Sequence, residues 1–305
     1  MRDFISMLDI TKDELEELLK LTEVLKEKQK KGEIFEPLKG KTLALIFEKP
    51  STRTRVSFEV GVIQLGGHGI YMDTRSSQLG RGEPIKDTAR VLSRYVDGIV
   101  IRTFEQERII ELGRYSKVPV INALSNEEHP CQILADLFTI KEYCRNLKGL
   151  KVAFLGDGNN VCNSWLIGAA MTGINFYAAT PKRYEPSEFY IEKAREIAKT
   201  TGAEIVITND PVEAVKEANI VYTDVWASMG QEEEAEKRKE IFMPYQVNSE
   251  LLKHAKPDVL FMHCLPAHRG EEVTEDVIES CRSIVWDQAE NRLHTQKALL
   301  TMLIR

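Results

Sequence analysis

Several features that define particular classes of protein are missing from this 305-residue sequence. No apolar run approaches the roughly 18 residues that a membrane-spanning helix needs. There is no glycine- and serine-rich linker, no low-complexity segment and no internal repeat. The five cysteines are an odd number and form no C-x-x-C pair, so a disulfide framework is not expected. A reducing, cytoplasmic location fits this cysteine usage better than an oxidising one.

The sequence also lacks an excess of basic residues. Its formal net charge is −6, which argues against nucleic acid as the main partner because phosphate backbones need a basic surface. The first residues, MRDFISMLDITKDELEE, are acidic and have no apolar core, so we expect neither a secretory signal nor a transit peptide. With 43% hydrophobic and 29% charged residues, the composition is that of a globular protein, and the length suggests two domains.

Short apolar runs alternate with amphipathic stretches along the chain, which predicts parallel sheets covered on both faces. The expected strands are 42–47, 69–72, 98–101 and 118–121, then 151–156, 175–179, 204–207, 219–223, 258–263 and 283–286. The expected helices are 11–30, 53–65, 85–95, 105–115, 131–146, 161–172, 187–200, 211–217 and 288–304. We therefore predict an α/β protein with two doubly wound parallel-sheet domains linked by helices, and a ligand site in the cleft between them. The expected domains are 1–135, with the helix 288–305 packing back near it, and 136–287.

A first polar motif, Ser51-Thr52-Arg53-Thr54-Arg55, follows a strand and opens a helix. Hydroxyl and backbone N–H groups at a helix N-terminus favour anions. Arginine adds forked, charge-assisted hydrogen bonds that suit phosphate. The motif therefore indicates a phosphate site, and the alternative is a well-capped helix with surface arginines.

Two further signals lie downstream in the first half of the chain. Arg102 follows the strand GIVI, and His129 and Gln132 open the next linking helix. An arginine at the carboxyl end of a buried strand points into the crevice of an α/β sheet, although a salt bridge is the alternative. His129 and Gln132 are spaced to donate hydrogen bonds to one carbonyl oxygen, whereas a lone histidine is more often structural.

The second half of the chain carries two polar motifs after strands. Asp224 opens the segment DVWASMG, where it is placed to bind an ammonium group or simply to cap a turn, and Ser228 is placed to bind a carboxylate. Gly230 precedes a very polar stretch, which suggests a lid. In HCLP, Cys264 follows His263 directly after a predicted strand. One alternative is that Cys264 is a buried structural cysteine. The other is an incidental metal site, which these two residues alone do not complete because zinc needs more ligands than two adjacent side chains.

A glycine-containing loop, Gly156-Asp157-Gly158-Asn159-Asn160, invites comparison with a dinucleotide-binding loop. The third glycine of that fingerprint is replaced by Val161, and the next strand does not end in an acidic residue that would bind a ribose. The sequence therefore lacks two features that a nicotinamide-dependent dehydrogenase requires.

Taken together and in this order, the motifs STRTR, SQLGRGEP, HPCQ, DGNN, DVWASMG and HCLP resemble the aspartate/ornithine carbamoyltransferases over residues 40 to 296. The SMG and HCLP elements are similar to the ornithine branch. In the loop around Gln78, the aspartate branch would carry a lysine that this chain lacks. The resemblance implies transfer of the carbamoyl group of carbamoyl phosphate to the δ-amine of ornithine, giving citrulline and phosphate, with no metal or organic cofactor. It also implies a homotrimer or a multiple of trimers.

The resemblance also implies residue roles. The residues implied for carbamoyl phosphate are Ser51, Thr52, Arg53, Thr54, Gln78, Arg102, His129, Gln132, Cys264, Leu265 and Arg292. Those implied for ornithine are Asn160, Asp224, Ser228 and Met229. The groups implied in catalysis are Arg102, His129, Gln132 and Cys264. Gln78 is similar to a residue that the family donates from a neighbouring subunit, and Cys264 is expected to orient the amine rather than to attack.

Three rival functions stay open at this point. The nearest is a sister transferase that uses putrescine, N-acetylornithine or aspartate as acceptor. A Rossmann-type NAD-dependent dehydrogenase is remote for the reasons given above. A non-catalytic protein that binds a phosphorylated metabolite is the third alternative.

Overall fold

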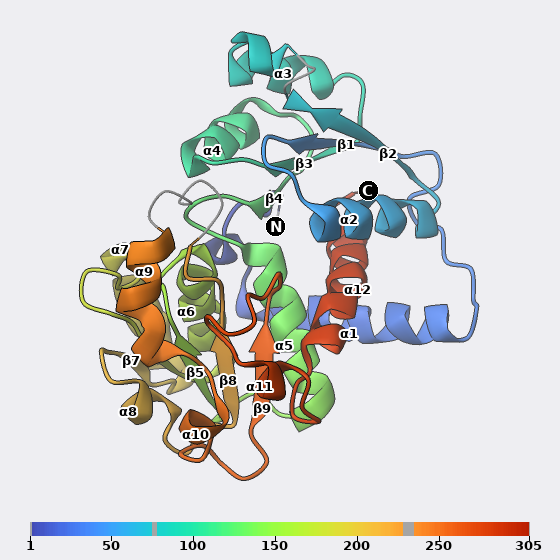
Figure 1. Cartoon of the computed structure of the whole chain (residues 1–305). Coiled ribbons are helices and arrows are strands. Elements are labelled where there is room, and N and C mark those ends of the chain that lie inside the picture. The colour runs from blue at the N-terminus through green and yellow to red at the C-terminus, as the bar shows by residue number, and fades with distance from the viewer. Residues whose placement is uncertain (1, 75–77, 228–234, 305) are drawn as a thin grey trace. The chain divides into compact units, whose positions relative to one another are not determined.

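The computed structural model describes residues 2–74, 78–227 and 235–304. The chain divides into two compact units, each built on a sheet of its own. The first unit combines residues 1–138 with residues 290–305, and the second comprises residues 139–289. Two helices, α5 (Pro130–Cys144) and α12 (Val285–Leu303), run from one unit into the other along the chain. Figure 1 traces both units from the N-terminus to the C-terminus.

The first unit is built on a four-stranded parallel sheet in the order β2-β1-β3-β4. Its strands are β1 (Thr42–Phe47), β2 (His68–Asp73), β3 (Gly98–Arg102) and β4 (Val120–Leu124). The central strands are buried along almost their whole length because helices cover both faces, as expected of a parallel sheet. This arrangement brings the carboxyl ends of β1 and β3 side by side, with Phe47 paired to Arg102.

Helices on the two faces of this sheet bury alternate residues of its strands. The helices of the first unit are η1 (Met7–Asp9), α1 (Lys12–Lys30), α2 (Thr52–Gln64), η3 (Leu79–Arg81), α3 (Ile85–Leu92) and α4 (Gln106–Tyr115). On one face, Ile46 and Ile101 pack with α3 and α4, whereas α2 lies on the opposite side (Figure 1). The capping box predicted at the start of α1 is present, with Thr11 and Glu14 bonded reciprocally.

The end of the chain packs into the first unit. A Cβ atom built on Gly98 would lie 2.5 Å from the Cδ1 atom of Ile304, so glycine at this position of β3 makes room for the residue that follows α12. Lys26 of α1 donates a hydrogen bond of 2.8 Å to Asn291 of α12. The first unit is therefore completed only by residues 290–305 at the end of the chain.

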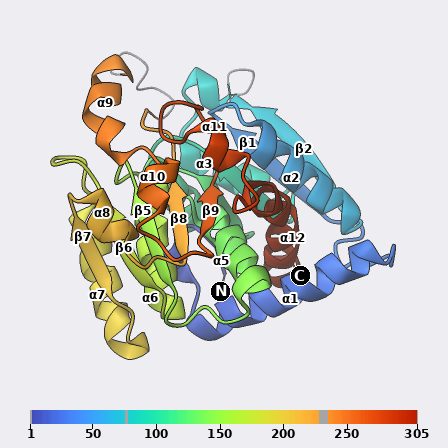
Figure 2. The ribbon, with the colours of Figure 1, turned by 60° about the horizontal axis from the view of Figure 1, so that its bottom comes forward.

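The second unit contains a five-stranded parallel sheet in the order β7-β6-β5-β8-β9, which can be followed from left to right in Figure 2. Its strands are β5 (Lys151–Leu155), β6 (Asn175–Ala179), β7 (Ile205–Thr208), β8 (Ile220–Thr223) and β9 (Leu260–His263). Its other helices are α6 (Asn160–Thr172), α7 (Glu188–Thr201), α8 (Pro211–Val215), α9 (Ala235–Phe242), η5 (Met243–Tyr245), α10 (Ser249–Leu252) and α11 (Glu275–Ile278).

Successive side chains of β5 and β8 point to opposite faces of the sheet, so the second unit has one core on each face. Phe154 and Tyr222 stack on one another, and Trp165 of α6 contacts Tyr222 edge-on. Ala153 and Val221, one residue away on the same strands, belong to a cluster with α8, α10 and α11. Both faces of the sheet are therefore buried, which confirms the predicted parallel α/β architecture.

One predicted strand is wrong. The sequence predicts a last strand over residues 283–286, but only a single bridge joins Ser283 to Phe261, and α12 begins at Val285. A run of four residues does not distinguish a strand from the first turn of a helix. The predicted strand 118–121 begins two residues early and ends three residues early, since β4 spans Val120–Leu124.

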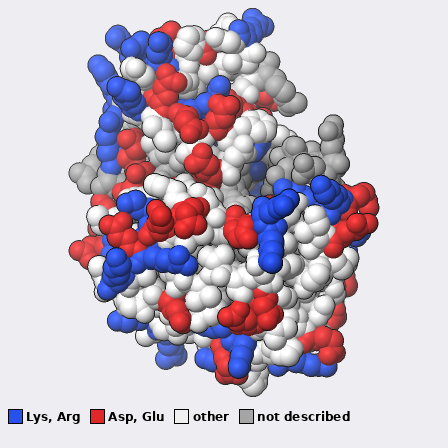
Figure 3. All heavy atoms as spheres, turned by 90° about the vertical axis from the view of Figure 1, so that its left-hand side faces the viewer, with Lys and Arg blue, Asp and Glu red and all other residues white. Residues whose placement is uncertain are grey.

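The surface carries charge of both signs. Basic and acidic side chains are interspersed over most of the face shown in Figure 3. Among the described residues, no helix combines the length and the apolar character required to cross a bilayer.

Candidate functional site

The start of α2 presents the first group of predicted site residues. Ser51 is the N-cap of this helix, and its side chain accepts a hydrogen bond of 3.3 Å from the N–H of Thr54. Thr52 and Arg53 are exposed on the first turn, whereas Thr54 is buried. The helix N-terminus, with its partial positive charge, therefore carries hydroxyl groups and one exposed guanidinium group.

Two buried arginines converge on Thr54. Arg102, the last residue of β3, donates to the Thr54 hydroxyl at 3.4 Å. Arg292 of α12 donates to the same oxygen at 3.2 Å. Residues far apart in the sequence thus meet at one hydroxyl oxygen. The predicted position of Arg102 at the end of a strand is confirmed.

Gln132 connects Arg292 to α5. Its Oε1 atom accepts a hydrogen bond of 2.6 Å from Arg292, and its Nε2 atom donates to Asp136 at 2.8 Å. These contacts fix the direction of the amide, with its oxygen toward the arginines. Asp136 is itself fully buried, one turn along the same helix.

His129 lies buried beside the same arginines. Its pKa is well below the ordinary value, first because burial disfavours the charged imidazolium, and then because Arg292, Arg102 and Arg53 repel it. His129 is therefore neutral at pH 7, with one ring N–H to donate and one nitrogen to accept. Because the charge of Arg53 also lowers the pKa of His129, this exposed side chain contributes to the positive potential at His129 together with Arg102 and Arg292.

The two arginines of the STRTR motif have different surroundings. Arg55 pairs with Glu59 at 3.1 Å on the exposed face of α2 and stacks on the ring of Tyr71, with 3.6 Å to the centroid. The alternative interpretation, a surface arginine, therefore fits Arg55.

Gln78, the residue predicted to act in a neighbouring subunit, lies at the start of η3 and is exposed.

Lys49 is a further cation that the sequence analysis missed. Its Nζ atom donates to Asn126 at 2.6 Å and lies 4.2 Å from the ring centroid of Phe104. Burial and, to a smaller extent, the positive charge of Arg102 lower the pKa of Lys49 to about 8. Its position two residues before Ser51 was the available signal, but a lysine in a loop is usually a solvated surface residue.

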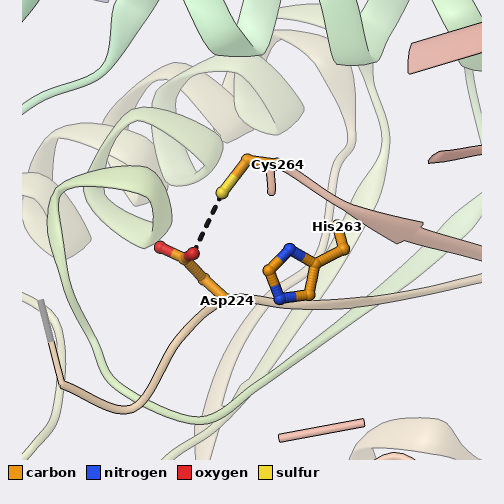
Figure 4. Close-up of side chains that lie close together, drawn as sticks. All are labelled: Asp224, His263 and Cys264. Atoms are coloured by element: carbon orange, nitrogen blue, oxygen red, sulfur yellow. Dashed lines mark hydrogen bonds between the residues drawn. The ribbon is translucent and has the colours of Figure 1, made fainter. Parts of the chain in front are cut away.

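In the second unit, Asp224 is the centre of the other group of predicted residues. The Cys264 thiol donates to Asp224 Oδ1 at 3.0 Å, as Figure 4 shows, and the N–H of Val225 donates to the same oxygen at 2.8 Å. Asn159 Nδ2 donates to the other oxygen, Oδ2, at 2.7 Å. Both carboxylate oxygens are therefore held in place, and Asp224 stabilises its turn as well as facing Cys264.

Asn159 is a second residue that the sequence analysis missed. It is the N-cap of α6 and accepts hydrogen bonds from Val161 and Cys162, while its amide reaches Asp224. The residue predicted for ornithine is its neighbour Asn160, which is the first residue of the helix. Two consecutive asparagines cannot be told apart without the position of the helix start.

His263 supports the turn that contains Cys264. Its Nδ1 atom accepts a hydrogen bond of 2.8 Å from the N–H of Leu265, so the proton resides on Nε2, which donates to Glu272 at 3.1 Å. Leu265 has a positive φ of 58°, and this bond offsets some of the strain. Cys264 points toward Asp224, away from this network.

Asp224, His263 and Cys264 place one potential metal-ligating atom each within 4.8 Å of one another. Both ring nitrogens of His263 are already engaged, one as an acceptor and one as a donor. A metal ion here would have to break one of these buried hydrogen bonds. The geometry therefore favours a polar binding site over a resident metal centre.

An ion pair positions the segments on either side of Asp224. Arg238 of α9 donates to Asp157 and to the carbonyl oxygen of Trp226, each at 2.9 Å. Both charged side chains are nearly buried. Next to Asp157, Gly158 allows a close approach of the loop to the backbone of residues 184–186, because a Cβ atom there would overlap the backbone nitrogen of Pro186. Arg238 was also missed, since a basic residue in the run EAEKRKE predicts only a solvated helix.

The remaining predicted residues belong to the HCLP and DVWASMG motifs of the second half of the chain. Leu265 follows Cys264 in the turn and packs against the core of the second unit. Ser228, Met229 and the expected lid glycine Gly230 lie outside the described residues.

Comparison with known proteins covers nearly the whole chain. Residues 2–142 match the family described as "Aspartate/ornithine carbamoyltransferase, carbamoyl-P binding domain". Residues 148–303 match "Aspartate/ornithine carbamoyltransferase, Asp/Orn binding domain".

Among similar proteins, the ornithine carbamoyltransferase of Anoxybacillus flavithermus is 58% identical over 99% of this chain and 96% of its own. The protein of Pyrococcus furiosus named "Ornithine carbamoyltransferase, anabolic" is 54% identical, with the same coverage. The solved structure of ornithine carbamoyltransferase from Pyrococcus furiosus has a TM-score of 0.97 and 54% identity, covering 99% of this chain and 97% of that one.

The Asp157–Arg238 pair makes a prediction about pH and stability. Burial raises the pKa of Asp157 to about 6, with a smaller contribution from the charge of Asp224, while Arg238 opposes the rise. A carboxyl whose pKa is raised in the folded state binds its proton more tightly when folded, so stability is lost as pH rises through about 6.

We therefore expect the unfolding free energy of the wild type, relative to Asp157→Asn, to fall by on the order of 2–3 kcal/mol between pH 4 and 7. Urea unfolding at several pH values measures this difference. A difference that stayed constant over that range would contradict the assignment.

Proposed function

Because this chain belongs to the aspartate/ornithine carbamoyltransferase family, we propose that it transfers the carbamoyl group of carbamoyl phosphate to the δ-amine of L-ornithine, giving L-citrulline and phosphate. The observation that carries the proposal is a set of three arginines, Arg53 at the start of α2, Arg102 and Arg292, whose charges act on the neutral His129 before α5. The Pyrococcus furiosus relative is named anabolic, and this name supports a role of the present chain in arginine biosynthesis.

The donor half-site lies in the domain 1–135 with the returning helix 288–305. Ser51, Thr52, Arg53 and Thr54 bind the phosphate at the helix N-terminus, where unpaired N–H groups favour an anion. Arg102 and Arg292 leave the Thr54 hydroxyl to bind ligand oxygens, since a dianion is a far stronger acceptor than a hydroxyl group. Lys49 adds a nearby cation to this field.

His129 and Gln132 act on the carbamoyl group. A neutral imidazole donates its N–H to the carbonyl oxygen without adding another positive charge to a crowded site. Gln132 keeps Arg292 in position through the bond between Oε1 and the guanidinium group. Negative charge that grows on the carbonyl oxygen during attack is thus met by donors that are already placed.

The acceptor half-site lies in the domain 136–287. Asp224 binds the amino acid's ammonium group, and Asn160, Ser228 and Met229 complete the ornithine pocket, as the family resemblance implies. Cys264 and Leu265 border the two ligands. Asn159 and Arg238 act as positioning residues, because they fix Asp224 and Trp226 without being assigned to substrate.

The reaction requires the δ-amine to lose a proton before it attacks. An alkylamine like that of lysine has a pKa of about 10.4, so deprotonation at pH 7 costs roughly 4.6 kcal/mol. That first proton leaves to solvent. The amine nitrogen then bonds to the carbamoyl carbon, the bond from that carbon to the phosphate oxygen breaks, and the departing phosphate accepts the second proton that the nitrogen loses. Holding amine and carbonyl in contact supplies up to about 7–11 kcal/mol of the rate enhancement.

Cys264 orients the amine rather than forming a covalent intermediate. Its thiol donates to Asp224, and the buried histidine beside it in sequence faces Glu272 and Leu265 instead. A cysteine nucleophile needs an adjacent base that takes its proton. The Cys264 thiol is a neutral hydrogen-bond donor, so the negative charge of Asp224 stays available for an ammonium group.

The assembly proposed is a homotrimer, or a multiple of trimers, in the cytoplasm. Gln78, exposed at the start of η3, is proposed to complete the donor half-site of a neighbouring subunit. Exposed apolar side chains on α2 and β2, including Ile63 and Ile70, supply an apolar surface suited to subunit contact. The five free cysteines fit a reducing compartment. Sedimentation equilibrium tests the assembly directly.

The substrate assignment is tested by offering the purified chain carbamoyl phosphate with ornithine, putrescine, N-acetylornithine or aspartate. We expect rapid citrulline formation with ornithine and much slower transfer to the others. Faster transfer to any of the other three would replace the assignment by that of a sister transferase.

The donor half-site is tested by a matched pair of arginine variants on the same helix. Arg53→Ala should lower kcat/KM by about 10²–10³-fold, the usual effect of removing one donor from a growing negative charge. Arg55→Ala is the control, because Arg55 stacks on Tyr71 and pairs with Glu59. Equal effects of the two substitutions would refute the phosphate role of Arg53.

The role of Cys264 is tested by Cys264→Ser. A hydroxyl still donates to Asp224, so we expect a raised KM for ornithine, a moderate loss of kcat and little change in the KM for carbamoyl phosphate. Complete loss of turnover with intact binding of both substrates would indicate a covalent role for the thiol.

A further inference from the structure

A second cluster of metal-ligating side chains lies in the turn after β9. His268, Glu271 and Glu272 place one ligand atom each within 4.8 Å of one another. The Nδ1 atom of His268 lies 3.8 Å from Glu271 Oε2 and 4.0 Å from Glu272 Oε2. His268 is exposed and Glu272 is fully buried, so the cluster runs from the surface into the core of the second unit.

Glu272 supplies an independent indication of a ligand. Its Oε1 atom accepts from His263 Nε2 at 3.1 Å and from the N–H of His268 at 2.6 Å. Its Oε2 atom is buried and has no hydrogen-bond partner among the described residues. A buried carboxylate oxygen without a partner is costly, because nothing replaces the water that it has lost. This oxygen is directed toward His268.

The other two ligand atoms are also available. Glu271 uses Oε1 to pair with Lys239 at 3.3 Å, which leaves Oε2 on the side of His268. A neutral imidazole offers a lone pair on the nitrogen that carries no proton. Each of the three residues therefore directs one ligand atom to the same small region, within 4.8 Å of the other two.

We propose that His268, Glu271 and Glu272 form a binding site for a divalent transition-metal cation of the zinc class. One imidazole nitrogen and two carboxylate oxygens match the ligands that Zn²⁺ and Co²⁺ accept, and water completes a coordination sphere that is open to solvent. Two carboxylates also compensate the charge of the cation, whereas Ca²⁺ and Mg²⁺ prefer oxygen ligands alone.

The site is distinct from the group around Asp224. Both nitrogens of His263 are engaged in hydrogen bonds, whereas Glu272 Oε2 has no hydrogen-bond partner among the described residues. The two sites are connected, since Glu272 holds His263 with one oxygen and would hold the cation with the other. A bound cation would thereby stiffen the turn that carries Cys264. The proposal rests on this geometry and does not depend on the function proposed above.

The test uses the full chain after chelator treatment, titrated with Co²⁺ and followed by its visible absorption. We expect one equivalent to bind, without the near-ultraviolet band of cobalt–thiolate charge transfer, and Zn²⁺ to displace it. His268→Ala should weaken binding by more than about tenfold, since even outer-sphere partners contribute that much. His254→Ala is the matched control, an exposed histidine in the same unit.

A second readout does not require a coloured metal. Zn²⁺ should raise the Tm of the wild type and of His254→Ala, but not that of His268→Ala or Glu271→Gln, because a cation that binds only the folded state stabilises it. Failure to bind, binding that survives both cluster substitutions, or a thiolate band that reveals Cys264 or Cys281 as the ligand would each overturn the proposal.

Discussion

Concentration of positive charge around a buried imidazole is the constraint on which the first unit depends. Burial, and then the charges of three guanidinium groups, lower the pKa of His129 and keep it neutral. The guanidinium groups also repel one another, so the site is costly to assemble without an anion. The fold nevertheless holds these side chains in one fixed arrangement. The end of β3, the start of α2 and the returning α12 deliver Arg102, Thr54 and Arg292 to one point. Such a site gains most when a dianion replaces the repulsion by attraction.

The second unit solves the opposite problem, since it must keep a carboxylate charged and correctly aimed. Asp224 accepts hydrogen bonds on both oxygens from groups that are themselves neutral: an asparagine amide, a thiol and a backbone N–H. Its charge is therefore positioned without being neutralised. The nearby cation Arg238 pairs with Asp157 instead, which leaves Asp224 to attract a positively charged ligand.

The sequence predicted the features that depend on local patterns. Strands such as 42–47 and 175–179 were correct because buried parallel strands form short apolar runs between helices. Residues 283–286 failed because a short apolar run also begins a helix. Lys49, Asn159 and Arg238 were missed because their importance comes from burial and from partners distant in sequence, such as Asn126, Asp224 and Asp157. Neither composition nor periodicity reveals such tertiary partners.

The return of the chain into its first unit has a consequence for biosynthesis. Residues 139–289 emerge from the ribosome as a continuous segment that contains every strand of its own sheet, whereas the first unit waits for residues 290–305. Domains generally fold as units during translation. The later-encoded unit is thus the first to have all its parts, and Arg292 reaches Thr54 only after the second unit has been made. A nascent chain therefore cannot assemble its donor pocket before residue 292 has left the ribosome.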